Sequence, residues 1–392
     1  MKHSDRLISI QRRIYWRPRH VSLGILIVIT LLALAGLWAV ERFRVEKRQP
    51  YYTEKLAAAT LAEQAMLAIK SERLRLGIPI DPVIDPTESG LLGSMWTPVT
   101  TEMGRLAAKQ TTVNPNFAAV LVQMLKETGA KAGDEVAIGY SGSFPAMNLC
   151  VLAAVQTLHL KPLIIASCGA SQWGANEPGF LWVDMEHMLY EKHIFKFHSL
   201  AASIGGDNDL GVGMDPKGRE DIIRTIHRLK LPFIHEPSYA ESVDRRMEIY
   251  RDRAGNKPIR IYINVGGGAS SLGRGAGRAE FPPGVVKHAP PGIKARSSVI
   301  MRFLTEEHSR TIDIRDIEFL AHRYGLPVMP TLMPGVGEGG VFQREEFNDW
   351  LAFGVLAVLI LIIWGFLRTE WGGRVFRTTR QSSRPSPPEP MV

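Results

Sequence analysis

Two short loops rich in serine and glycine carry the side chains best suited to chemistry. The first, Ser141-Gly142-Ser143, follows the apolar run 135–140 and precedes Pro145, a residue typical of the first turn of a helix. Small residues at a strand-to-helix turn expose backbone N–H groups, which favours a carboxylate or phosphate ligand. The turn also approximates the G-x-S-x-G elbow that displays a nucleophilic serine, except that Ser143 replaces the last glycine. An anion site, a nucleophilic Ser141 and a turn without chemistry remain open.

The second loop, 167–176, follows the apolar run 163–166. Its polar and aromatic side chains are suited to hydrogen-bonding a substrate amide and to forming an apolar wall: Ser171, Gln172, Trp173 and Asn176. The alternatives are a thiolate nucleophile at Cys168, for which the sequence shows no histidine partner, and an ordinary loop at the end of a strand.

A run of three glycines, Gly266, Gly267 and Gly268, follows the apolar run 258–265. Such a run permits close approach of a phosphate or of another backbone. It does not complete the G-x-G-x-x-G pattern, because Ser271 stands at the sixth position, and no acidic ribose partner is evident. We therefore predict a ligand-binding loop, with no nicotinamide, flavin or other cofactor.

His235 and Glu236 are the best-placed candidates for acid–base chemistry, because they end the apolar run 232–235. If the strands are parallel, these residues share a sheet edge with Ser141. A Ser141–His235 dyad oriented by Glu236 or Asp184 would then pair a nucleophile with a general base. The alternative is a half-buried polar residue at a strand end.

Three aspartates, Asp207, Asp209 and Asp215, alternate with glycines in the loop 205–215. They lack the glutamate and the spacing of a calcium loop. We interpret this segment as a solvated loop and predict no metal site.

Strands that alternate with helices must position these loops. Residues 134–176 read as strand, turn, helix and strand, with both strands as continuous apolar runs, which is typical of a buried parallel pair. The carboxyl ends of parallel strands meet at one edge of the sheet, where open α/β folds bind ligands. We therefore predict an α/β fold with a mostly parallel, doubly wound sheet.

Further elements follow from local patterns. Helices are predicted over 55–75, 185–190, 217–229, 239–251 and 317–324. Strands are predicted over 196–204, 232–235, 258–265, 299–304 and 311–314, and residues 273–296 are predicted to loop over the surface.

The formal net charge of +8 lies at the two ends of the chain. Residues 1–44 carry eight Lys/Arg and two Asp/Glu, residues 346–392 carry five and four, and residues 45–345 keep a net charge of only +1. Nucleic-acid binding depends on a basic surface that neutralises phosphates. The nearly neutral main domain therefore excludes nucleic acid as the expected partner.

Two long apolar segments lie beside the basic ends. Residues 21–40 contain no charge, and residues 350–367 form a second run of 18 residues. About 20 apolar helical residues cross a hydrocarbon core of about 30 Å. A cleaved signal peptide is the alternative for the first segment, but the run is long and no small-x-small site precedes the basic Arg42-Phe43-Arg44. We predict two spans in a lipid bilayer.

The flanking charges orient these spans. Six Lys/Arg lie in residues 1–20 and five lie from Arg368 onward, whereas residues 344–349 are net negative. Four basic residues in 41–48 oppose this assignment. We predict an inner- or plasma-membrane protein with both termini cytoplasmic and the main domain extracytoplasmic. The predicted parts are a basic N-terminus (1–20), a transmembrane helix (21–40), a membrane-proximal helix and loop (41–110), the α/β domain (111–345), a second transmembrane helix (350–367) and a disordered tail (368–392).

Several sequence blocks together resemble the bacterial family called poly-γ-glutamate system protein. They are GSMWTPVTT (93–101), GYSGSFPAMN (139–148), SCGASQWGANEPGFLWVDME (167–186), INVGGGASSLG (263–273), RYGLPVMP (323–330) and PGVGEGGVF (334–342). The resemblance covers residues 50–345 and implies a pathway, an envelope location and a polyanionic partner. It carries over no catalytic residues.

The implied partner is poly-γ-glutamate or a γ-glutamyl chain, together with the membrane synthase subunits. A chain with one α-carboxylate per unit needs helix N-termini, backbone N–H groups and Lys/Arg. Three parts of the chain supply these groups: the turn 141–143, the glycine run 266–268 and a basic stretch. The basic stretch comprises Arg274, Arg278, Lys287, Lys294 and Arg296.

We therefore expect a membrane-anchored envelope protein that assists synthesis, export or attachment of the polymer. The alternative is a serine-dependent hydrolase or transferase that acts on γ-glutamyl amide bonds with Ser141 as nucleophile. A scaffold for the synthase is a third possibility.

Overall fold

The computed structural model describes residues 23–255, 257–273, 281–294 and 296–368. Its helices are α1 (Leu23–Arg42), α2 (Tyr52–Arg75), α3 (Leu106–Thr112), α4 (Phe117–Glu127), α5 (Pro145–Thr157), α6 (Trp182–Glu191), α7 (Pro216–Arg228), α8 (Tyr239–Ala254), α9 (Ala269–Leu272), α10 (Val299–Thr305), α11 (Ile317–Tyr324) and α12 (Asp349–Arg368). Its strands are β1 (Val45–Arg48), β2 (Glu135–Ser141), β3 (Lys161–Ser167), β4 (Asn176–Glu177), β5 (Phe180–Leu181), β6 (Ala201–Ser203), β7 (Phe233–Ile234), β8 (Ile261–Val265), β9 (Gly284–Val286), β10 (Arg310–Ile314) and β11 (Gln343–Glu346). The predicted N-terminus (1–20) and residues 369–392 of the predicted tail lie outside the described residues.

The chain divides into two compact units. One comprises Arg48–Arg344, and the other comprises the residues up to Lys47 together with those from Glu345 onward. The predicted boundary at residue 110 does not separate units, because α2 packs against α4 and α5 of the same α/β unit.

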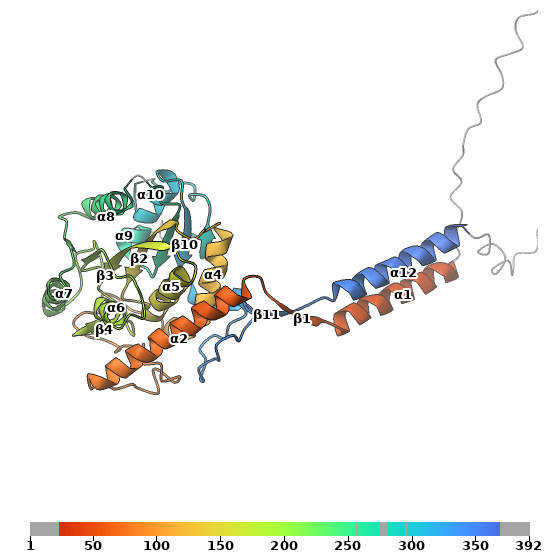
Figure 1. The fold of residues 1–392 in the computed structure, drawn as a ribbon, viewed down its shortest axis with the longest axis horizontal. Helices are drawn as coiled ribbons and strands as arrows, with labels where there is room; N and C mark the ends of the chain where they lie inside the picture. Colours follow the sequence, from red (N-terminus) through yellow and green to blue (C-terminus); the bar gives the residue numbers. More distant parts are fainter. Residues whose placement is uncertain (1–22, 256, 274–280, 295, 369–392) are drawn as a thin grey trace, which may run out of the picture. The chain divides into compact units, whose positions relative to one another are not determined.

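A seven-stranded sheet in the order β7-β6-β3-β2-β8-β10-β9 forms the centre of the α/β unit (Figure 1). Its pairs are parallel except that of β9 with β10, which is antiparallel. This confirms an α/β fold with a mostly parallel sheet. The chain first adds strands outward on one side of β2 and then returns with β8 to its other side. Ile138 of β2 therefore pairs with Ile164 of β3 on one side and with Ile263 of β8 on the other.

Buried apolar side chains form two clusters. Along β2, Val136 and Ile138 belong to one cluster and Ala137 to the other, so the clusters lie on opposite faces of the sheet. Helices α2, α4, α5, α6, α7 and α11 contribute to the first cluster, and α8, α9 and α10 to the second. In Figure 1 the second group of helices lies above the strands and α2, α5 and α6 lie below them.

Two sequence predictions of secondary structure are wrong. Residues 299–304, predicted as a strand, belong to helix α10, which starts where the Ser298 side chain accepts a hydrogen bond from the Met301 N–H. A short, fully buried apolar run does not distinguish a strand from a helix by its period. Residues 273–296, predicted as a surface loop, contain the edge strand β9.

The segment 93–105 is irregular but firmly attached to the loop after β3. The Gly93 N–H donates to the Trp173 carbonyl (3.2 Å), and the Trp173 N–H donates to the Ser94 carbonyl (3.0 Å). A third bond runs from the Thr101 N–H to the Ala170 carbonyl (2.8 Å). On its other side, Gly218 of α7 lies so close to the Pro98 carbonyl that no side chain fits between them.

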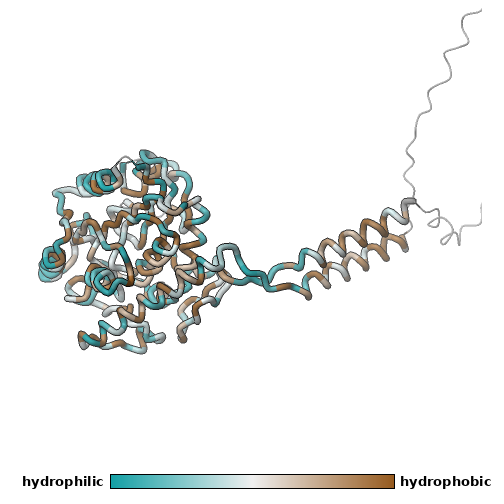
Figure 2. Tube along the Cα trace, viewed as in Figure 1, coloured by the Kyte–Doolittle hydropathy of each residue, from teal (hydrophilic) through white to brown (hydrophobic). Residues whose placement is uncertain are grey.

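Helices α1 and α12 are each long and apolar enough to cross a membrane, and almost none of their described residues is buried. Figure 2 shows both helices as hydrophobic along most of their length. They pack against each other where Gly36 faces the side chain of Val355. The first residues of the predicted span 21–40 lie outside the described residues.

The contact between Gly218 and Pro98 leads to a stability prediction. We expect Gly218→Ala to lower the free energy of unfolding by about 1–3 kcal/mol, because the added methyl group must displace backbone. Chemical denaturation of the full-length protein in detergent, followed by tryptophan fluorescence, measures this change. Gly268→Ala is the control, since its Cβ meets nothing within 4 Å and its φ is −53°, and we expect a change below about 1 kcal/mol. Equal stabilities of the two variants would contradict the prediction.

Candidate functional site

Three of the predicted loops meet at the carboxyl ends of β2, β3 and β8. The Gly142 N–H donates to the Ser167 carbonyl (3.0 Å), and the Ala175 N–H donates to the Gly142 carbonyl (2.8 Å). Gly266, with φ +89°, comes so close to Ser141 that an added Cβ would lie 2.5 Å from its Oγ. The strand order reverses between β2 and β8, which is where open parallel sheets leave a crevice for a ligand.

Two cavities open at this edge, with volumes of about 510 Å³ and about 250 Å³. Both are lined by Glu102, Ser143 and Gly267, so we treat them as one cleft with a large and a small lobe. Ser171 and Lys109 line the large lobe. Ser141 and Gly268 line the small one.

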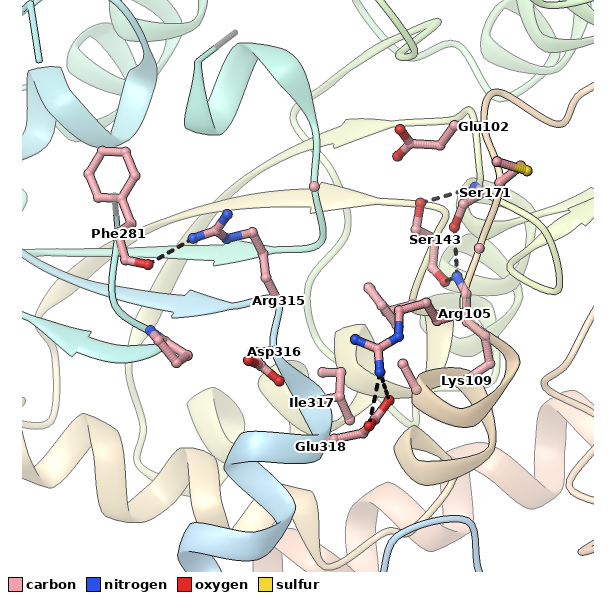
Figure 3. Close-up of a pocket in the computed structure, with 16 residues that line it drawn as sticks. Glu102, Arg105, Lys109, Ser143, Ser171, Phe281, Arg315, Asp316, Ile317 and Glu318 are labelled. Carbon is pink, nitrogen blue, oxygen red and sulfur yellow. Dashed lines mark hydrogen bonds and ion pairs between the residues drawn. The ribbon is translucent and has the colours of Figure 1, made fainter. Parts of the chain in front are cut away.

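Helix α3 and the segment before it form a wall of the large lobe that the sequence patterns did not predict. Lys109 of α3 is 2% exposed. Its Nζ contacts the Ser143 carbonyl and lies 2.8 Å from Ser171 Oγ and 4.2 Å from the centre of the Phe144 ring (Figure 3). Burial lowers the pKa of Lys109 to about 7, although the nearby Glu102 carboxylate favours the charged form. The only signal in the sequence is a lysine within a run of small residues, LAAKQTT.

The charges of the large lobe are balanced. Its basic side chains are Arg105, Lys109 and Arg315, and its acidic ones are Glu102, Asp316 and Glu318. Figure 3 shows Arg105 directed at Glu318, with Nη2 2.8 Å from Oε1. Arg315 donates to the buried carboxylate of Asp313 (2.7 Å) and to the Phe281 carbonyl (2.9 Å). The lobe therefore offers charges of both signs to a ligand.

Three of the predicted site residues in the loop 167–176 hold the segment 93–105 rather than line the cleft. The Gln172 side-chain oxygen accepts from the Gly104 N–H (3.1 Å). Asn176 is fully buried and donates to the Ser94 carbonyl (2.8 Å) and to Thr100 Oγ1 (3.0 Å). Gln172, Trp173 and Asn176 line neither lobe, whereas Ser171 lines the large one.

The strand order does not bring His235 and Glu236 to Ser141. They follow β7, and β6 and β3 lie between β7 and β2. At about 4.8 Å per strand, about 14 Å separates the two sites. The exposed His235 ring stacks on Phe233, with centroids 5.2 Å apart. The prediction of a shared edge rested on parallel strands, which are present, but strands that share an edge need not be neighbours.

The described residues of the basic stretch assigned to the polymer do not line the cleft. Arg274 and Arg278 lie outside the described residues. Lys287, Lys294 and Arg296 are exposed and line neither lobe, and Arg296 pairs with Glu306 (3.1 Å). The two cysteines, Cys150 and Cys168, are free and buried, and burial raises the pKa of both thiols.

A buried ion pair supports the floor of the small lobe. Arg246 and Asp209 are 2% and 3% exposed, and their closest atoms are 2.8 Å apart. Arg246 also donates to Ser167 Oγ (3.2 Å) and Ser203 Oγ (2.6 Å), at the ends of β3 and β6. The interpretation of Asp209 as part of a solvated loop is therefore wrong. Among the described residues, no group of three or more His, Cys, Asp or Glu is placed to hold a metal ion.

This pair leads to a second stability prediction. We expect Asp209→Ala to lower the free energy of unfolding by about 3–5 kcal/mol, because it leaves the Arg246 charge buried without its carboxylate. Chemical denaturation of the full-length protein measures this change in the free energy of unfolding. The double variant Asp209→Leu/Arg246→Met removes both charges and should recover much of the loss. Arg245→Met, which breaks an exposed pair with Glu248, is the control and should cost at most about 1 kcal/mol. Additive losses in the double variant would contradict the prediction.

Comparison with known proteins leaves the family of this chain unassigned. No family model matches it, no curated protein matches it and no solved structure matches it. The resemblance to the poly-γ-glutamate system family stays a prediction from the quoted sequence blocks, and a functional proposal rests on the geometry of the cleft.

Proposed function

We propose that this protein is a membrane-anchored component of the cell envelope in a poly-γ-glutamate synthesis or export system. Its α/β unit binds a γ-glutamyl chain in the cleft, and the synthase subunits are a second partner. The observation that carries the proposal is the meeting of the turn 141–143, the loop after β3 and the glycine run 266–268 around one cleft.

The lining suits a thin peptide-like ligand. Serine and glycine residues line both lobes, so small polar groups face a ligand that carries carboxylates and amide carbonyls. Helix α5 begins at Pro145, two residues after Ser143, so the positive end of its dipole lies beside both lobes. These features favour a ligand that combines amide bonds with carboxylates.

The balanced charge further favours the amino-terminal end of the chain over its interior. In the interior, each repeat of a γ-linked chain carries a carboxylate and no cation. Its amino-terminal residue carries an ammonium and an α-carboxylate on the same carbon. Glu102 lines both lobes and Asp207 lines the small one, so an ammonium finds acidic partners there, while the start of α5 attracts the carboxylate.

The two apolar helices support the membrane anchor. Both are of bilayer-spanning length and leave almost none of their described residues buried, which is costly in water. The charge pattern supports cytoplasmic termini and an extracytoplasmic α/β unit. We also infer a doubly wound sheet, since buried clusters with their own helices lie on both faces.

Binding of short oligomers tests the proposed ligand. We expect the full-length protein in detergent to bind a γ-linked glutamate oligomer more tightly than its N-acetylated form or an α-linked oligomer of equal length, because only the first has both charges on its terminal carbon. Calorimetry or fluorescence anisotropy measures the affinity. Gly268→Phe should weaken binding at least about tenfold, since its Cβ has open space and its side chain fills the small lobe.

The matched control is Ser71→Phe, which adds the same ring to an exposed position of α2. It should bind as the unmodified protein does. Equal binding of all three oligomers, or full binding by Gly268→Phe, would contradict the proposal.

Topology has a separate test. Val83 is 80% exposed, whereas both native cysteines are buried, so Val83→Cys adds one reactive thiol. We expect a membrane-impermeant maleimide to label it in intact spheroplasts, as the outward orientation requires. Ser4→Cys, in the basic N-terminus, should be labelled only after the membrane is permeabilised. The reverse pattern would overturn the orientation.

A further inference from the structure

Ser171 is the only one of the described cleft serines whose hydroxyl contacts a nitrogen able to accept a proton. Its Oγ lies 2.8 Å from Lys109 Nζ. Ser141 Oγ and Ser143 Oγ accept from backbone N–H groups, those of Ser143 and Ser171. Ser167 Oγ contacts the guanidinium of Arg246, which stays protonated in proteins.

We propose that Ser171 and Lys109 form a nucleophile–base pair that catalyses acyl transfer from an amide or ester bound in the large lobe. Figure 3 shows the lysine amine directed at the two serines, on the side of the cavity formed by α3. Serine–lysine pairs on unrelated folds carry out this chemistry, so the arrangement is judged by geometry rather than by chain order.

The surroundings of Lys109 fit the part of a base. A neutral lysine amine has two N–H donors and one lone pair. One N–H reaches the Ser143 carbonyl, and the lone pair is then available to the Ser171 hydroxyl. Desolvation of the nearly fully buried amine favours this neutral form near neutral pH.

The reaction balances without any redox partner. Ser171 Oγ bonds to the carbonyl carbon while its proton passes to Lys109 Nζ and the carbonyl π electrons move to oxygen. On collapse the carbon–nitrogen or carbon–oxygen bond breaks, and the leaving group takes its electron pair and the proton from the Lys109 ammonium. Water or an amine then attacks the Ser171 ester by the same steps in reverse, which restores the hydroxyl.

Neighbouring groups favour the charges that this step creates. The Phe144 ring, 4.2 Å from Nζ, stabilises the transient ammonium. The N-terminus of α5 follows Ser143, and its dipole favours the developing oxyanion. Trp173, two residues after Ser171, has φ +58°, a strained conformation for a bulky side chain and one found often at catalytic turns.

An activity probe tests the pair without assuming a natural substrate. We expect an alkyl fluorophosphonate to label the full-length protein in detergent at Ser171, identified by peptide mass spectrometry. The labelling rate should rise about tenfold from pH 6 to pH 8, because the base is lost as Lys109 is protonated below its pKa of about 7.

Variants assign the two roles. Ser171→Ala should abolish labelling, and Lys109→Met should slow it at least about hundredfold, with no rescue by Lys109→Arg, since guanidinium accepts no proton. Lys55→Met and Ser309→Ala are matched controls and should label normally. Lys55 is a buried lysine of α2 bonded to the Val341 carbonyl, and Ser309 is a buried serine that precedes β10. The pH profile of the unmodified protein keeps the test valid even where a variant fails to fold.

No labelling of Ser171, a rate that is constant with pH, or full labelling of a folded Lys109→Met would overturn the pair. If the proposed function holds, the acyl group is a γ-glutamyl unit, and the protein shortens or transfers the polymer in a Ser171-dependent way. Labelled Ser171 with an intact polymer would support the pair and count against that substrate. Binding of the polymer without labelling of Ser171 would support that substrate and count against the pair.

Discussion

The parallel pairing of β8 with β2 is the contact on which the cleft depends. The chain leaves β2 on one side, builds β3, β6 and β7, and returns to the other side, so loops more than a hundred residues apart end at the same point. Gly139 pairs with Asn264 across this contact, and a side chain at Gly139 would collide with the Tyr262 hydroxyl. Gly266 directly follows Val265, the last residue of β8, and lies next to Ser141. The two close approaches explain why both strands end in glycine-rich sequence.

Burial of charge shapes the site as much as the strand order does. Lys109 and Arg246 are both almost inaccessible to water, but their surroundings differ. Arg246 has the carboxylate of Asp209 as its counter-ion, so the pair is a permanent structural charge. Lys109 has hydroxyl, carbonyl and ring neighbours and, among the described residues, no carboxylate in hydrogen-bond contact, so burial lowers its pKa to about 7. Desolvation thus acts on both groups with different results. Arg246 keeps its charge and supports the fold, whereas Lys109 can gain or lose a proton.

The sequence predicted the fold class and the central strands better than the site. The apolar runs of β2 and β3 and the proline that begins α5 indicated the unit around Ser141, because local patterns determine those elements. Edge strand β9 lies among glycines and prolines and shows no run of its own. Strand order cannot be obtained from period or composition, so the distance between His235 and Ser141 was inaccessible. The burial of Lys109 is likewise a tertiary property, created by the segment 93–105 folding over the loop after β3.

The glycines that fasten the segment 93–105 have a consequence for entry into the cleft. The backbone touches other backbone or a buried amide at three glycines, Gly93, Gly104 and Gly218. This wall of the cleft therefore has little freedom to move. A rigid wall of this kind is consistent with the proposed slender, unbranched ligand, because such a ligand needs no movement of the wall to enter. Because little of the protein must become ordered when a ligand enters this cleft, the entropy lost on binding would fall mainly on the ligand.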